Sequence, residues 1–212
     1  MSLHDRWLAT LERAGLGLSP TLWRDVEAHY REEHRAYHTL HHLAACFHEL
    51  DASEAPASVA LELAIFFHDV IYDPRAADNE EASARFAARS LEALGATASL
   101  RADVSRLVLV TKHDAEPAAA DEQLLVDIDL SILGTEPGTF DVYEREVRQE
   151  YAFVSDAAFR AGRAAILETM LTRAQIYTTP WFQNRYERRA RHNLARSIAT
   201  LRAEQAGSSG EA

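Results

Sequence analysis

The sequence predicts an all-α fold, and three observations support that prediction. Apolar residues recur every three to four positions along almost the whole chain, which is the period of an amphipathic helix. Serine, threonine, aspartate and proline stand where such helices would begin, and glycine stands where several would end. Alternating strand patterns bounded by Asn-Gly or Asp-Gly turns are absent from the sequence. We therefore expect one helical bundle of about nine helices.

The first half of the chain carries the clearest helix signals. Trp7 and Leu11 share one face of a first helix that Gly15 would stop. Ser19-Pro20 begins the second, because serine caps a helix and its first turn tolerates proline. A third helix starts near Leu40. Residues 57 to about 71 are strongly apolar and predict a buried central helix.

The next helix should open at Asp78, because Glu81 follows three residues later as in a capping box, and Gly95 should close it. Further helices are expected at residues 98–112, 121–133, 137–153, 156–173 and 180–203. Loops are expected at residues 72–80 and 114–120. Residues 1–204 are predicted to form a single domain, and residues 205–212 a disordered tail.

Charge and cysteine content narrow the class of protein. The 22 basic and 33 acidic residues give a net charge of −11, which argues against binding to a nucleic-acid polymer or to an anionic membrane. The most apolar run, residues 59–67, contains Glu62 and is too short to span a bilayer. Cys46 is the single cysteine, so no internal disulfide is possible and we expect a cytoplasmic protein.

Histidines and acids form a pattern typical of a metal site. Seven of the ten histidines lie between His29 and His68. His38 and His42 are four residues apart, so they share a helix face. His68-Asp69 ends the most apolar helix, where a buried polar pair is costly unless a partner such as a divalent cation satisfies it. Asp127 and Asp129 interrupt another apolar helix in the same way.

In this order, the motifs YHTLHH, FFHDVIYDP, TKHD and DIDLSILG resemble the HD-domain superfamily of metal-dependent phosphohydrolases, in particular a bacterial subfamily of predicted HD phosphohydrolases. The likeness extends over about residues 20–200. It implies an HD-type helical bundle with His42, His68, Asp69 and Asp129 as metal ligands. His42 is preferred to His38 because its separation from His68 fits the superfamily better. Asp129 is preferred to Asp127 because the superfamily ligand usually begins the apolar turn that follows, here from Leu130, and both alternatives stay open.

The resemblance also implies an activity. Imidazole and carboxylate ligands suit Mn²⁺, Fe²⁺, Ni²⁺, Co²⁺ or Zn²⁺, with Mg²⁺ also considered, and such an ion activates water for hydrolysis of a phosphate ester. The expected substrate is a small phosphorylated metabolite, with a nucleotide favoured. Glu81 is the candidate to orient the water, with Glu80 and Asp73 as alternatives, while Lys112 and His113 would contact the phosphate.

Two other functions remain open. One is a di-iron oxygenase that recruits further histidines among His38, His41 and His113. The other is a regulatory module that binds a metal or nucleotide without turnover. Lys112 is the only lysine in the chain, which draws attention to its position.

Overall fold

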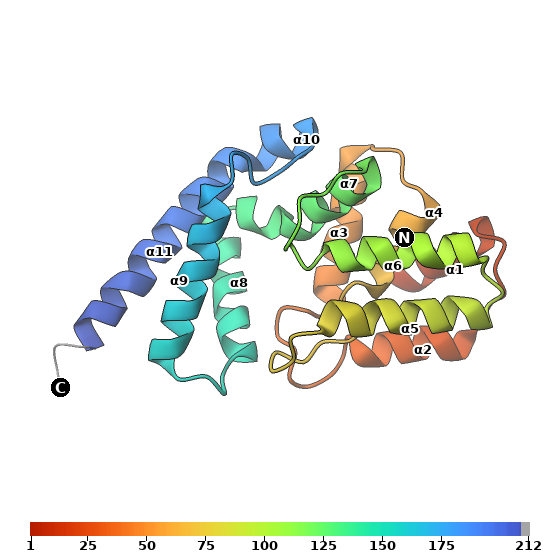
Figure 1. Cartoon of the computed structure of the whole chain (residues 1–212), viewed down its shortest axis with the longest axis horizontal. Helices are drawn as coiled ribbons and strands as arrows, with labels where there is room; N and C mark the ends of the chain where they lie inside the picture. The colour runs from red at the N-terminus through yellow and green to blue at the C-terminus, as the bar shows by residue number, and fades with distance from the viewer. Residues whose placement is uncertain (209–212) are drawn as a thin grey trace. The chain divides into compact units, whose positions relative to one another are not determined.

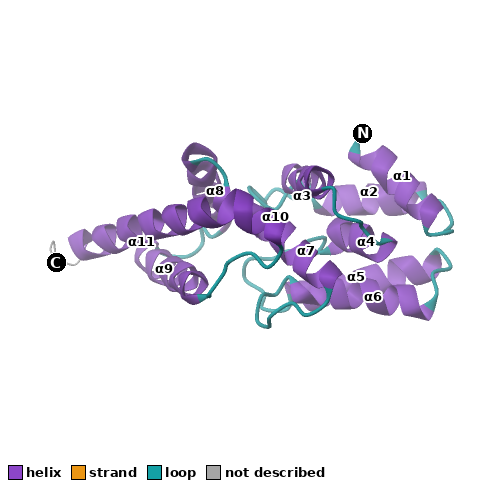
Figure 2. Cartoon of the chain, turned by 90° about the horizontal axis from the view of Figure 1, so that it is seen from above, coloured by secondary structure: helices purple, strands orange, loops and turns teal. Residues whose placement is uncertain are grey.

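The computed structural model describes residues 1–208, and these contain helices and loops but no strand, as Figure 2 shows. The all-α prediction is therefore confirmed, and the number of helices is close to the expected nine. The more specific HD-domain architecture stays a prediction. The chain divides into two compact units, Met1–Asp129 (unit 1) and Leu130–Ala212 (unit 2).

Unit 1 is built from seven α-helices, labelled in Figure 1. They are α1 (Leu3–Arg13), α2 (Pro20–His29), α3 (Leu40–Ser53), α4 (Val59–Phe67), α5 (Asn79–Ala93), α6 (Ala98–Val110) and α7 (Ala120–Asp129). Serine or threonine side chains cap the first turns of α1, α2, α3, α4 and α6, where backbone N–H groups lack helical partners. Gly15 and Gly95 follow α1 and α5 at φ +66° and +84°, which glycine adopts without strain.

The core of unit 1 surrounds α4, which packs against α1, α3, α5, α6 and α7 (Figure 1). Residues 61–67 are all buried, so this helix is enclosed on every side, as its apolar sequence predicts. The ring of Trp7 contacts those of Phe66 and Phe67 edge-on. Glu62 is buried among them, and it accepts a hydrogen bond of 2.7 Å from Thr10 Oγ1 and pairs with Arg13.

Two local expectations for unit 1 are wrong. The central helix ends at Phe67 rather than near residue 71, and Val70 N then donates to Phe67 O in a turn at 3.2 Å. The capping box at the start of α5 does not form, because Asp78 makes no capping hydrogen bond there. Asp78 pairs instead with Arg85, and Glu81 pairs with Lys112, so both acids have stronger partners than the backbone.

Unit 2 contains η1 (Leu130–Gly134), α8 (Pro137–Glu150), α9 (Asp156–Thr172), α10 (Pro180–Phe182), η2 (Gln183–Glu187) and α11 (Arg188–Ser208). Helices α9 and α11 lie side by side (Figure 1). The helix expected at 121–133 changes to a 3₁₀ turn after Asp129, and the one expected at 180–203 includes a π turn. Helix α11 runs to Ser208, so part of the expected tail is helical, and residues 209–212 lie outside the described residues.

Close packing explains both irregular turns. A Cβ on Gly134 would collide with the backbone and Cβ of Tyr186, which lies in η2. Side chains of unit 2 also bind the carbonyls of η1: Tyr177 Oη donates to Leu130 O at 2.9 Å and Asn193 Nδ2 to Leu133 O at 2.9 Å. These tertiary contacts replace the helical hydrogen bonds that a regular α-helix would make.

A membrane-spanning helix would need a long apolar run. Within the part of the chain that the structure describes, every helix falls short of that length and apolarity.

Candidate metal centre

Four side chains of unit 1 bring nitrogen and oxygen atoms to one point, and we call them the donor cluster: His42, His68, Asp69 and Asp129. The Nε2 atoms of His42 and His68 are 3.1 Å apart. Asp129 Oδ1 lies 3.3 Å from His42 Nε2 and 3.7 Å from His68 Nε2. Asp69 Oδ2 lies 3.5 Å and 3.1 Å from the same two nitrogens. The ligand set implied by the resemblance is thus brought together in space.

Three neighbouring helices position the cluster. His42 lies on the buried face of α3, His68 caps the C-terminus of α4 with Asp69 directly after it, and Asp129 is the last residue of α7. These helices pack against one another within unit 1. The C-terminus of a helix carries partial negative charge, so the end of α4 adds to the attraction for a cation.

One hydrogen bond sets the tautomer of His68. Its Nδ1 lies 2.9 Å from the carbonyl oxygen of Ile65, and because a carbonyl only accepts, Nδ1 must carry the proton. In the neutral ring Nε2 then has a free lone pair, directed at the other donors. A backbone carbonyl on the far nitrogen is the usual arrangement for a histidine that binds a metal.

The spacing of the four atoms fits ligands around one divalent cation. Ligands about 2.1 Å from a metal are separated by about 3.0 Å in an octahedron and about 3.4 Å in a tetrahedron. The five distances above run from 3.1 to 3.7 Å. Two imidazole nitrogens and two carboxylates at this spacing need a shared proton or a cation, because uncompensated lone pairs in a buried site are costly.

The charges of the cluster depend on one another. Burial lowers the pKa of His68, but the neighbouring Asp69 and Asp129 outweigh it and raise the pKa to about 9. Burial would raise the pKa of Asp129, but hydrogen bonds from His113 and His42 hold it well below its usual range. Burial lowers the pKa of His42, so that ring stays neutral. Without a metal, both acids are therefore anions and His68 carries a second proton at neutral pH, so a cation that binds must displace that proton from Nε2.

The cluster is open on its carboxylate side. The side chains of His42 and His68 are 2% and 1% exposed, whereas those of Asp69 and Asp129 are 18% and 17% exposed. The imidazoles are therefore enclosed, and solvent reaches the cluster at its two carboxylates.

His113 joins the centre through Asp129. Its Nε2 lies 3.1 Å from Asp129 Oδ2, while the other oxygen, Oδ1, faces the two histidines. His113 has φ +59°, in the left-handed region that residues other than glycine seldom adopt. This strained turn follows α6 and directs the ring toward Asp129. Of the residues expected to act beside the metal, His113 is the one in contact with the donor cluster.

Glu81 and Lys112 contact each other, and neither makes a hydrogen bond or ion pair with the donor cluster in the described residues. Lys112 lowers the pKa of Glu81, and Glu81 raises the pKa of Lys112. Glu81 is therefore an anion and can accept a proton. Lys112 would have to leave Glu81 to meet a phosphate, which the 34% exposure of both side chains permits.

Cys46 is a donor that the sequence reasoning missed. Its Sγ lies 3.7 Å from His42 Nε2, and ligand atoms of His42, Cys46, His68 and Asp129 all lie within 4.8 Å of one another. The signal was present, because Cys46 follows His42 by four residues on one helix. Burial raises the pKa of the thiol, so Cys46 would act as a ligand only when a cation displaces its proton.

The alternatives to the cluster residues take other positions. His41 is exposed on α3, and Asp127 is fully buried. The ring of His38 packs against that of Tyr72 at a tilt, with centroids 4.3 Å apart. Burial would raise the pKa of Asp69, but His68 and the charge of His38 lower it. His38 therefore lies beside the cluster rather than among its converging atoms.

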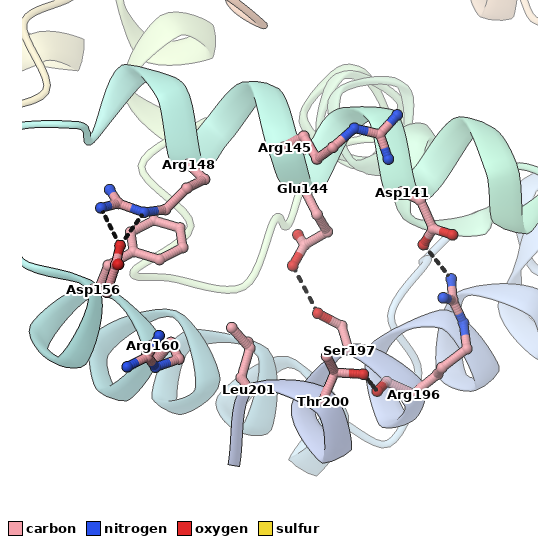
Figure 3. Close-up of a pocket in the computed structure, with 11 residues that line it drawn as sticks. Asp141, Glu144, Arg145, Arg148, Asp156, Arg160, Arg196, Ser197, Thr200 and Leu201 are labelled. Carbon is pink, nitrogen blue, oxygen red and sulfur yellow. Dashed lines mark hydrogen bonds and ion pairs between the residues drawn. The ribbon is translucent and has the colours of Figure 1, made fainter. Parts of the chain in front are cut away.

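Unit 2 contains a groove of about 560 Å³ between α8, α9 and α11 (Figure 3). Polar pairs cross it at one-turn intervals along α8. They are Asp141 with Arg196, Glu144 with Ser197 and Arg148 with Asp156, at 2.6, 2.7 and 2.7 Å. Each acid in the groove already has a partner, so these pairs serve to join helices. The groove is therefore a weaker candidate for a functional site than the donor cluster.

Comparisons of this chain with protein-family models, with curated proteins and with solved structures found no match. The fold and the site therefore define the class on their own: an all-helical protein with a buried cluster of imidazole and carboxylate groups that could bind a metal ion.

Proposed function

We propose that this protein is a metal-dependent phosphohydrolase that acts on a small phosphorylated metabolite, with nucleotides as the first substrates to test. The observation that carries the proposal is the convergence of His42 Nε2, His68 Nε2, Asp69 Oδ2 and Asp129 Oδ1. The resemblance of the sequence to HD-domain phosphohydrolases supports the same activity.

The side chains divide the work of hydrolysis. A divalent ion in the cluster would supply Lewis acidity and lower the pKa of its bound water. His42 and His68 would hold the ion, and the carboxylates of Asp69 and Asp129 would balance its charge. Glu81, kept anionic by Lys112, is our candidate to accept a proton from that water. Lys112 can offer its charge to a phosphoryl oxygen once it separates from Glu81.

The test combines metal analysis with a turnover assay. Purified protein would be freed of metal with a chelator, reloaded with Mn²⁺ or Co²⁺, and assayed for phosphate release from a panel of nucleotides. We expect turnover that depends on the metal and is lost in His68→Ala and in Asp69→Ala, because each substitution removes a ligand. Full activity in either variant would overturn the proposal.

One observation favours a second candidate, a di-iron oxygenase. Asp129 faces His42 and His68 with one oxygen and His113 with the other, so it could bridge two ions. Two irons per chain with no phosphate release would support this function. Bound metal with no turnover on any substrate would instead favour a regulatory module.

A further inference from the structure

Arg35 is a buried arginine that the proposed chemistry does not use. Its side chain is 0% exposed, although it lies in the loop between α2 and α3. Nη1 donates to the carbonyl oxygens of His38 and Asp69 at 3.0 and 2.7 Å, and Nη2 donates to Val70 O at 3.0 Å. Nε donates to Glu32 Oε2 at 3.0 Å. One guanidinium thus binds backbone just before α3 and just after α4.

These contacts belong to a larger set at the end of α4. The last carbonyls of a helix have no helical partner and must be satisfied otherwise. Here side chains or turn N–H groups bind them in succession: His68 Nδ1 binds Ile65 O, Tyr30 Oη binds Phe66 O, Val70 N binds Phe67 O, and Arg35 binds Asp69 O and Val70 O. Asp69 is the only donor-cluster residue whose backbone Arg35 binds directly.

The site around Arg35 suits a guanidinium in particular. Its Cζ lies 5.2 Å from the ring centroid of Tyr30 and 5.4 Å from that of Tyr72. The planar fork reaches three carbonyls and one carboxylate in fixed directions. A lysine ammonium is a single compact charge and cannot span the same acceptors.

We infer that Arg35 is a positioning residue of the metal centre. It holds the backbone of Asp69 and of His38, four residues before His42, so that ligands from α3 and α4 are in register before an ion binds. Its charge is directed to carbonyl oxygens and to Glu32, and it forms no ion pair with Asp69 or Asp129. This role rests on the proposed metal-dependent function.

The test is the affinity of the folded protein for Co²⁺, read from the visible absorption of the bound ion. Arg35→Lys should weaken Co²⁺ binding by about 10- to 100-fold, the usual cost of losing a residue that orients metal ligands. The spectrum should also change, because the ligand geometry is relaxed. Arg6→Lys is the matched control: Arg6 is 11% exposed, binds Asp51 through both Nη atoms and covers Phe47, yet contacts no backbone of the cluster.

Stability of the metal-free proteins, measured in parallel, separates positioning from general packing. The inference would be overturned if Arg35→Lys binds Co²⁺ with the affinity and spectrum of the wild-type protein and differs only by a lower melting temperature. If Arg35→Lys does not fold, Glu32→Gln is the second variant, because it keeps the arginine but removes the charge of its carboxylate partner. It should weaken Co²⁺ binding by about 10-fold or less. Co²⁺ binding equal to that of the wild-type protein would overturn the inference. Failure of the wild-type chain to bind Co²⁺ would count against the proposed function itself.

Discussion

The two units differ in the partners of their half-buried acids. Of the chain's 33 acidic and 22 basic residues, unit 1 has 23 and 11, a net charge of −12, and unit 2 has 10 and 11, a net charge of +1. In unit 2 the half-buried Glu144 binds Arg163, and the half-buried Glu187 binds Arg191. In unit 1 the half-buried Asp69 and Asp129 meet histidines.

This difference explains why one unit holds a candidate metal centre and the described part of the other does not. An arginine is always charged and satisfies a carboxylate by itself. A histidine presents a lone pair when neutral, so a group of histidines and carboxylates becomes neutral and fully paired when a cation enters. Two half-buried acids therefore form structural ion pairs in unit 2, and two others form part of a candidate metal site in unit 1.

The largest effect should come from removing an inward-facing histidine. We expect His42→Ala to weaken Co²⁺ binding by more than about 100-fold. This loss of affinity is larger than the one expected when a residue that only orients the ligands is replaced. His41→Ala, at the exposed neighbouring position, should bind Co²⁺ like the wild-type protein. Isothermal titration calorimetry on the two variants checks the pair, and equal affinities would contradict the assignment of His42.

The second effect concerns stability in unit 2. Arg163→Ala leaves Glu144 mostly buried without its main cationic partner, which should lower the free energy of unfolding by about 3–5 kcal/mol. Arg202→Ala removes an exposed pair with Glu168 and should cost less than about 1 kcal/mol. Urea unfolding measures both. Metal affinity should stay unchanged in each variant, and a loss of affinity in Arg163→Ala would break the contrast between the units.

The third effect separates two acids of α7. Asp129→Asn should weaken metal binding by about 10-fold or more, because an amide has no charge to balance the cation. Asp127→Asn should lower the free energy of unfolding by about 1–3 kcal/mol, since Asp127 is fully buried, while affinity is kept. Calorimetric titration and urea unfolding of each variant decide the question. The reverse pattern would make Asp127 the ligand.

The smallest effect is expected at Lys112. Lys112 lowers the pKa of Glu81 in the folded protein. The stabilisation from this ionised pair is therefore present above the pKa that Glu81 has in the unfolded chain, and it is lost as the pH falls through the pKa of Glu81 in the folded protein. In Lys112→Ala the pKa of Glu81 should return toward its ordinary value, as an NMR titration would show. Metal binding should stay, and the KM for a phosphorylated substrate should rise. An unchanged KM would remove Lys112 from the site.

Most helix positions were predictable, because apolar period and capping residues are local signals. The donor cluster was expected from the resemblance to HD-domain proteins, and local signals alone left His38 and Asp127 open. The 3₁₀ turn after Asp129 and the π turn at Tyr186 were not, since they follow from the close approach of Gly134 to Tyr186. Glu81 looked like a capping residue because its partner Lys112 lies 31 residues away.

Contacts to backbone carbonyls are also hidden in the sequence. The carbonyl partners of Arg35 depend only on where the chain turns and not on residue type. The four-residue spacing of His42 and Cys46 predicts that they share a helix face. That proximity points to a metal ligand only because the fold also brings His68 and Asp129 to the same place.

The place of Asp129 at the very end of unit 1 has a consequence for how the protein is made. As the chain leaves the ribosome, the first ligand appears at residue 42 and the last at residue 129, after every helix of unit 1. A nascent chain therefore cannot bring the donor cluster together until unit 1 is entirely synthesised and α3, α4 and α7 have docked. Under the proposed function, metal binding would be a late step of folding, and a cell short of the metal would accumulate a unit 1 that is complete in sequence but lacks the stabilisation that the ion supplies.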